Sequence, residues 1–519
     1  MRKNNTFRRA AALMAALSIT VSLAAPAFAD TYYIDYGDIT ITKNEDGSQT
    51  IKQGGEEWTD KAGEETVITT SNTVITTLES DLESPAAEDS DFGPVVEDNY
   101  QPAQPEDAEE SEDADQPEIA EEPKSADRQE SADQQAAPAA APADTTPVNP
   151  KDDGFWGNTI TVINNIADKV LNLTLKDVKI DVSDTGGDNF EFEDDQIGKA
   201  ALSVEGKGNV EIELDGNNEL KSGASKAGLE KTSTGKLTLK DDNNEAGSLT
   251  ATGGASAAGI GGGFQGKGEN ITITGGTVDA TGGYGSAGIG GGNGGVGKNI
   301  TITGGTVNAT SNDGAGIGGG LLGSGENIAI TGGTVNATGT DGAGIGGGNG
   351  GVGKNITITG GTVTAAGGFG NAGIGGGNGS DGENITITGG SVTATGGEFA
   401  AGIGGSNGGS GNNITIKGGT VTATGGEGGA GIGGGAEGGG GNNITIKGGT
   451  VTATGGGYRG NSGAGIGGGS SGSGENITIN DGKVTATGGN YAAGIGGGSV
   501  GAWGGDAGSG KTSPSTAAR

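Results

Sequence analysis

Hydrophobic and polar positions alternate along most of this chain in one phrase, which repeats from residue 270 to residue 498. In the copy that begins at residue 355, Ile356 and Ile358 alternate with threonines, and Val363 and Ala365 flank Thr364. Apolar residues at every second position, in a sequence rich in β-branched side chains, are typical of strands that bury one face. The pattern predicts two strands in each copy, and a third short strand at residues 372–374.

Glycine pairs separate the predicted strands. Gly360-Gly361 follows the first strand, Gly367-Gly368 follows the second, and a glycine-rich run from Gly375 follows the third. Glycine adopts the positive φ angles that tight corners require. Each copy therefore predicts three strands joined by three corners.

The phrase recurs with a period of 28 to 33 residues. A regular period of this length predicts a solenoid, in which each repeat buries its apolar face against its neighbours. Three strands and three corners predict one coil of a right-handed parallel β-helix, an all-β fold with coils about 4.8 Å apart. Degenerate copies begin near residue 155, so we expect about eleven to twelve coils over residues 151–505. Phe155, Trp156 and Trp503 are candidate caps of the two ends.

An asparagine opens each copy and has two interpretations. Asn-Ile-Thr is a formal N-glycosylation acceptor, but an asparagine at the same corner of every coil also predicts a ladder of side-chain amides along the stack. We favour the ladder. Its members are Asn270, Asn299, Asn327, Asn355, Asn384, Asn413, Asn443 and Asn476.

The segments before the repeats predict export. Residues 1–29 combine a basic start, an apolar core and the small-residue site Ala27-Phe28-Ala29, which is the pattern of a secretory signal peptide. We expect a secreted or cell-surface protein whose mature chain begins at Asp30 and has no transmembrane segment. Residues 30–78 show strand patterns, which predict either a small β module or detached first coils of the solenoid.

Residues 79–150 differ sharply in composition from the rest of the chain. They hold 22 acidic residues against Lys124 and Arg128, together with ten prolines. Such a segment buries too little apolar surface to offset its ordering entropy, so it predicts a disordered acidic linker. Because the net charge of the chain is −36, nucleic acid is not an expected partner. We expect residues 506–519 to be a disordered tail.

The chain contains no histidine and no cysteine. This composition excludes Ser-His-Asp and Cys-His catalysis, the usual zinc sites and disulfides. Residues 505–512 match the phosphate-binding loop by letter, but Pro514 follows where that loop needs a helix. Residues 376–381 begin like a calcium-binding nonapeptide, but Glu383 stands where a large apolar residue is needed.

One carboxylate cluster is a weak candidate for a metal site. It consists of Glu191, Glu193, Asp194 and Asp195, in a loop between early strands. Carboxylates are the oxygen ligands that calcium prefers, although a charged loop is usually only solvated. We therefore expect no cofactor, with calcium as the alternative.

Aromatic residues recur at one corner of the repeat, between the second strand and the Ala-Gly-Ile segment. Stacked coils would set them along one edge of the rod, with gaps at coils that carry Asp313, Asp341 or Glu427. Aromatic rings stack on the apolar faces of sugars, so such a row predicts polysaccharide binding; the other interpretation is that the rings only cover glycine-rich corners. The row consists of Tyr284, Phe369, Phe399, Tyr458 and Tyr491.

With its export signal and its repeated NITITGGTVTATGG…AGIGGG phrase, the chain resembles secreted carbohydrate-binding-domain proteins of Firmicutes over about residues 155–500. These are related in fold to the β-helical polysaccharide lyases. The resemblance implies an extracellular β-helix that contacts glycans, and no catalytic residues carry over. We expect a monomeric, non-enzymatic protein for carbohydrate binding or adhesion; the alternative is a lyase or glycosidase with its site in coils 170–250.

Overall fold

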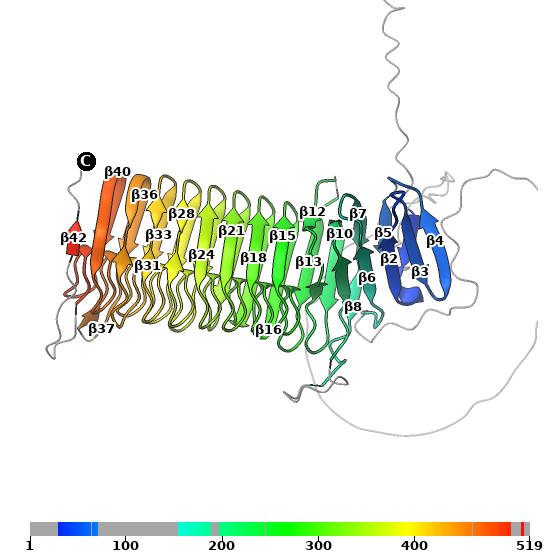
Figure 1. Cartoon of the computed structure of the whole chain (residues 1–519), viewed down its shortest axis with the longest axis horizontal. Coiled ribbons are helices and arrows are strands. Elements are labelled where there is room, and N and C mark those ends of the chain that lie inside the picture. Colours follow the sequence, from blue (N-terminus) through cyan, green and yellow to red (C-terminus); the bar gives the residue numbers. More distant parts are fainter. Residues whose placement is uncertain are drawn as a thin grey trace, which may run out of the picture. The chain divides into compact units, whose positions relative to one another are not determined.

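The structure is a computed structural model of the whole chain, and it describes residues 30–63, 65–70, 154–187, 197–243, 245–458, 460–499 and 510–512. Its described part is an all-β parallel solenoid, built from a 25-stranded and a 15-stranded sheet (Figure 1). The predicted fold class is confirmed. The predicted leader, the acidic segment 79–150 and Trp503 lie outside the described residues.

Each regular coil contributes three strands, as the alternation predicts. In one coil these are β23 (Ile345–Gly346), β24 (Gly353–Ile358) and β25 (Thr362–Ala366), and each pairs in parallel with its counterpart in the next coil. Apolar residues lie opposite their equivalents, for example Ile358 opposite Ile387. The stack therefore sets like residues over like residues.

The 25-stranded sheet contains the first and second strands of the coils. The first strands are β7 (Val170–Lys176), β12 (Leu237–Lys240), β15 (Gly268–Ile273), β18 (Gly297–Ile302), β21 (Gly325–Ile330), β24, β27 (Gly382–Glu383), β28 (Thr386–Ile387), β31 (Gly411–Asn412), β32 (Thr415–Ile416) and β35 (Gly441–Asn442). The second strands are β8 (Lys179–Asp181), β13 (Gly247–Thr252), β16 (Thr277–Ser286), β19 (Thr306–Asp313), β22 (Thr334–Gly339), β25, β29 (Ser391–Thr395) and β33 (Thr420–Thr424). In three coils a single long strand serves as both the first and the second strand. These are β10 (Asn209–Lys221), β36 (Thr445–Thr454) and β40 (Gly474–Thr487).

The 15-stranded sheet stacks the third strand position of every coil. Its parallel members are β6 (Ile160–Asn164), β9 (Leu202–Gly206), β11 (Leu229–Lys231), β14 (Ile260–Gly261), β17 (Ile289–Gly290), β20 (Ile317–Gly318), β23, β26 (Ile374–Gly375), β30 (Ile403–Gly404), β34 (Ile432–Gly433), β39 (Ile466–Gly467) and β41 (Ile495–Gly496). Small elements complete the described chain: the hairpin of β37 (Gly457–Tyr458) and β38 (Asn461–Ser462), and β42 (Gly510–Thr512), which pairs with β40.

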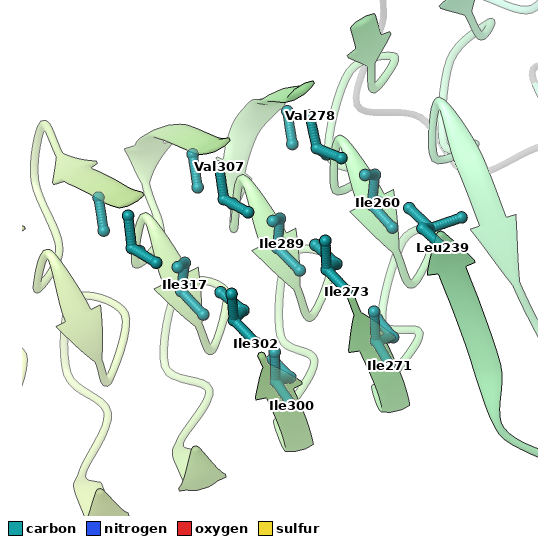
Figure 2. Packing of buried hydrophobic residues seen from close by; sticks show 14 of the residues in the cluster. Leu239, Ile260, Ile271, Ile273, Val278, Ile289, Ile300, Ile302, Val307 and Ile317 are labelled. Atoms are coloured by element: carbon teal, nitrogen blue, oxygen red, sulfur yellow. The ribbon is translucent and has the colours of Figure 1, made fainter. Parts of the chain in front are cut away.

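The core is a set of columns of apolar side chains. Ile356, Ile358, Val363, Ala365 and Ile374 are each at most 1% exposed, as the alternation predicts. Figure 2 shows the same columns in neighbouring coils, with the labelled isoleucines of successive third strands in a row. Full burial of each large side chain stabilises the fold by about 1.5–3 kcal/mol.

Glycine is required where coils approach closely. Gly375 has φ +140, and a Cβ atom built there would lie 2.0 Å from the carbonyl oxygen of Gly404 in the next coil. Any larger residue would push the two coils apart. This close approach explains why glycine follows the isoleucine of each third strand from β14 onward.

Residues 30–70 stack on the solenoid as its first coil. The strand β5 (Thr66–Thr69) pairs in parallel with β7 and with β1 (Asp30–Tyr33), and β2 (Ile39–Lys43) pairs in parallel with β6. A short 3-10 helix, η1 (Ile34–Tyr36), follows β1. The segment is therefore the first coil of the solenoid in this structure and not a separate module.

An antiparallel meander ends the 15-stranded sheet beyond β2. It consists of β2, β3 (Gln49–Gln53) and β4 (Glu56–Asp60). Phe155 and Trp156 do not end the stack as predicted, because β2 and β5 of residues 30–70 pair with β6 and β7. Trp156 instead forms a parallel bridge with Ile180 of β8, and the Lys221 ammonium lies 3.8 Å from the Phe155 ring centroid. The sequence period begins only near residue 155, so it left the first coil as one of two interpretations of residues 30–78.

Candidate functional site

The aromatic residues lie at the corner between the second and third strands, and most are exposed. Tyr284 is 49% exposed, Phe369 55% and Tyr491 88%, whereas Phe399 is half-buried. Tyr458 lies in β37, and its side chain is outside the described residues. Apart from these, the exposed large apolar side chains of the described residues are Ile197 and Leu322.

The aromatic residues occupy two neighbouring positions of the corner. This corrects the prediction that all of them lie at a single position of the repeat. Phe399 and Tyr491 have positive φ angles of 68 and 71. In the coils of Tyr284 and Phe369, the positive φ belongs instead to the next residues, Gly285 and Gly370. The row is therefore staggered by one residue between coils.

Phe369 and Phe399 form the one aromatic pair of this corner within the described residues. Their ring centroids are 5.5 Å apart with an interplanar angle of 82°, an edge-to-face contact between neighbouring coils. Backbone bonds fix both positions: Gly370 N–H donates to Glu398 O at 2.8 Å, and Ala436 N–H donates to Phe399 O at 2.7 Å. The pair is held on a rigid corner.

Asparagines hydrogen-bond to the backbone of this corner, and the sequence analysis did not single them out. The buried Asn371 donates from Nδ2 to Phe369 O at 2.5 Å and accepts from Asn378 N–H at 2.7 Å. In the next coil, Asn407 N–H donates to Gly370 O at 2.9 Å. The Asn407 Oδ1 atom is buried and accepts no hydrogen bond within the described residues. The available signal was the asparagine after the third-strand glycines in several coils, such as Asn378 and Asn407.

The gap in the aromatic row holds a pair of carboxyl groups. Burial raises the pKa of Asp313, and the neighbouring Asp341 carboxylate raises it further, while a hydrogen bond with Tyr284 opposes the shift. Tyr284, Asp313 and Asp341 belong to successive coils. Polar groups thus continue the row from Tyr284 toward Phe369.

The opening asparagines form a continuous amide ladder on another corner. Each Nδ2 donates to the Oδ1 of the preceding coil, at 2.9–3.2 Å, from Asn299 to Asn476. The first member, Asn270, donates to Thr234 O at 3.0 Å. All eight asparagines have φ between 54 and 59, a conformation that asparagine tolerates better than most residues. The ladder therefore uses both the amide and the backbone preference of asparagine.

The candidate metal ligands Glu191, Glu193, Asp194 and Asp195 lie outside the described residues. The part of the chain that the structure describes contains no group of three or more side chains able to hold a metal ion. Asp381, from the calcium-like motif, accepts from Ser410 N–H at 2.8 Å and from Asn412 Nδ2 at 3.0 Å. Both of its carboxylate oxygens therefore bond to the next coil.

Three carboxylates in coils 170–250, the alternative catalytic region, are paired with lysines of neighbouring coils. Glu213, which is 2% exposed, lies 2.9 Å from Lys240 Nζ and accepts from Asp242 N–H. Lys179 pairs with Glu219 at 2.8 Å, and Lys221 with Asp181 at 3.3 Å. These contacts give the carboxylates a structural role between coils.

Comparison with known families agrees with this geometry. The profile of the family described as "Beta helix repeat" matches nine successive segments, 245–264, 271–293, 300–321, 328–349, 356–378, 385–409, 414–436, 444–470 and 477–499. These segments are similar to beta-helix repeats. Most of the matched repeats run from the first strand through the aromatic corner and the third strand, so the match covers the described solenoid from β13 to β41.

No curated protein and no solved structure shows significant similarity to the chain. Among the described residues, no helix combines the length and apolar character needed to cross a bilayer.

Proposed function

We propose that this chain is an exported, non-enzymatic β-helix that binds polysaccharide along the aromatic corner of its beta-helix repeats. The supporting observation is the Phe369–Phe399 pair, whose partly exposed rings are in edge-to-face contact between neighbouring coils. Rings stack on the apolar faces of pyranose sugars, and amide groups bond the hydroxyls around them. Surface display would bring this corner to extracellular glycans.

The row fits a long glycan better than a single sugar. Phe369 and Phe399 are one coil apart, which is about 4.8 Å, and Tyr284 and Tyr491 lie about three coils beyond them on either side. Asp313 and Asp341 fill part of the interval and can accept hydrogen bonds from hydroxyls. An extended chain lying along the rod could contact all of these groups.

A panel of soluble and insoluble polysaccharides tests the proposal. We expect at least one to retain the full chain, and the double variant Phe369→Ala/Phe399→Ala to lose most of that retention. Leu322→Ala is the matched control. It also removes an exposed apolar side chain, since Leu322 is 74% exposed, but it does so at the corner after the third strand and not at the aromatic corner. Equal retention of the wild type and the double variant would refute the aromatic corner as the binding site.

A further inference from the structure

The second strands present a regular array of threonines on their outer face. From β19 to β36, each coil places three outward side chains at alternate positions, and fourteen of these eighteen side chains are threonine. We call this array the threonine grid. Its members are Thr306, Asn308, Thr310, Thr334, Asn336, Thr338, Thr362, Thr364, Ala366, Ser391, Thr393, Thr395, Thr420, Thr422, Thr424, Thr450, Thr452 and Thr454.

The register of the sheet makes the grid periodic in two directions. Thr364 lies opposite Thr393, Thr393 opposite Thr422, and Thr422 opposite Thr452. Coils repeat about every 4.8 Å along the rod, and alternate residues are about 6.7 Å apart along a strand. The grid therefore has two fixed repeat distances, as a crystal face does.

The grid carries no charge, although the chain has a net charge of −36. In the coils directly before and after the grid, equivalent positions hold Asp279 and Lys483. Within the grid, none of these positions holds a charged residue. Strand preference alone does not explain this, because exposed positions of the first strands include Lys354 and Lys447. The grid therefore fits an uncharged partner.

The hydroxyl groups of the grid are available. Every grid residue is at least partly exposed, and no threonine hydroxyl of the grid bonds to another protein group within the described residues. Threonine is stiff about χ1, so neighbouring side chains adopt the same orientation at little entropic cost. The threonine methyl groups restrict the orientation of the adjacent water molecules, and the hydroxyl groups hydrogen-bond to them. Together they favour an ordered layer of water on the grid.

We propose that the threonine grid binds the surface of ice. A rigid array that repeats in two directions matches a partner with the same repeats, and a crystal face of water is uncharged and rich in donors and acceptors. The grid contains no aromatic ring on which a sugar could stack, which distinguishes it from the aromatic corner. The inference is independent of the proposed polysaccharide binding.

Growth of an ice front through a dilute solution of the full chain tests this proposal. We expect the wild type to become enriched in the ice and to shape single crystals. The enrichment of the variant Thr393→Lys/Thr452→Lys in the ice should fall to that of a protein with no affinity for ice. The reason is that each ammonium group projects from the grid and disrupts the ordered water. Thermal unfolding of each variant establishes that it folds.

The matched control is Thr331→Lys/Thr388→Lys, at the residues directly after the first strands β21 and β28. Both threonines are exposed, and the same column naturally holds lysine at residues 417 and 447. This control should retain the enrichment. The proposal fails if the wild type is excluded from ice, or if both variants lose enrichment equally. It also fails if the grid variant loses binding only to a crystalline polysaccharide such as cellulose.

Discussion

At the scale of single residues, the clearest departure from the repeat is Lys231. It is only 3% exposed, pairs in register with Val204, and donates from Nζ to Ser233 O at 2.7 Å. Burial lowers the pKa of Lys231 from 10.5 to about 8. The neutral amine is therefore more favoured in the folded than in the unfolded chain, so a charged Lys231 destabilises the fold.

The variant Lys231→Met should stabilise the protein at pH 7. The pKa shift corresponds to about 3 kcal/mol, from which about 1 kcal/mol is lost with the bond to Ser233 O, so the expected net gain is about 2 kcal/mol. The penalty is complete below pH 8 and disappears as the pH rises toward 10.5. Guanidinium unfolding at pH 7 and at pH 10.5 checks this, and equal stability at pH 7 would contradict it.

At the scale of strands and corners, the amide ladder and the apolar columns follow from the same stacking. Asn355 donates to Asn327 at 3.0 Å and accepts from Asn384 at 3.1 Å, while its backbone has φ 56. The asparagine thus supplies a bond to each neighbouring coil and a corner conformation. Substitutions can separate the two contributions.

Replacing Asn355 by glycine should cost about 1 kcal/mol, because the amide bonds are lost but positive φ remains accessible. Replacing it by alanine should cost about 2 kcal/mol, since alanine also disfavours the left-handed conformation. Chemical unfolding measures both. Equal losses for the two variants would show that positive φ is unimportant, and no loss for glycine would show that the ladder adds nothing.

The alternation of residues such as Ile356 and Thr357 was enough to predict strands, burial and stacking, because period two and the repeat length leave few other folds. The stagger between Phe369 and Phe399 is visible in the spacing, because Phe369 lies five residues before Ile374 and Phe399 lies four before Ile403. Its consequence, a positive φ at Phe399 but not at Phe369, needed the structure. Asn407 escaped notice because its bond to Gly370 O arises from contact between coils.

At the scale of the whole molecule, the rod is stabilised coil by coil, and its ends are the critical points. At one end, the Tyr32 hydroxyl donates to Asp60 Oδ1 at 2.6 Å, and Thr66 donates to Asp60 Oδ2 at 2.5 Å. These bonds tie the meander to β1 and β5. Residues 30–70 were not assignable from sequence because their partners lie beyond residue 153, outside the repeat.

Removal of residues 30–70 should destabilise the solenoid and promote association. Ile160 and Leu173, now fully buried, would lose their covering, and the edges of β6 and β7 would be left to pair with other molecules. We expect a lower melting temperature and larger particles in size-exclusion chromatography. A chain that begins at Asp30 is the control, and unchanged behaviour after the deletion would contradict the first-coil role.

The first coil joins the rest through strand pairing, while the covalent connection between β5 and β6 runs from Thr69 to Ile160. A protease that severs this connection would therefore leave a split protein whose two fragments remain docked. Denaturing electrophoresis would separate two bands, whereas native sedimentation would find one species. The same fragments, made as separate polypeptides, should reassemble by complementation.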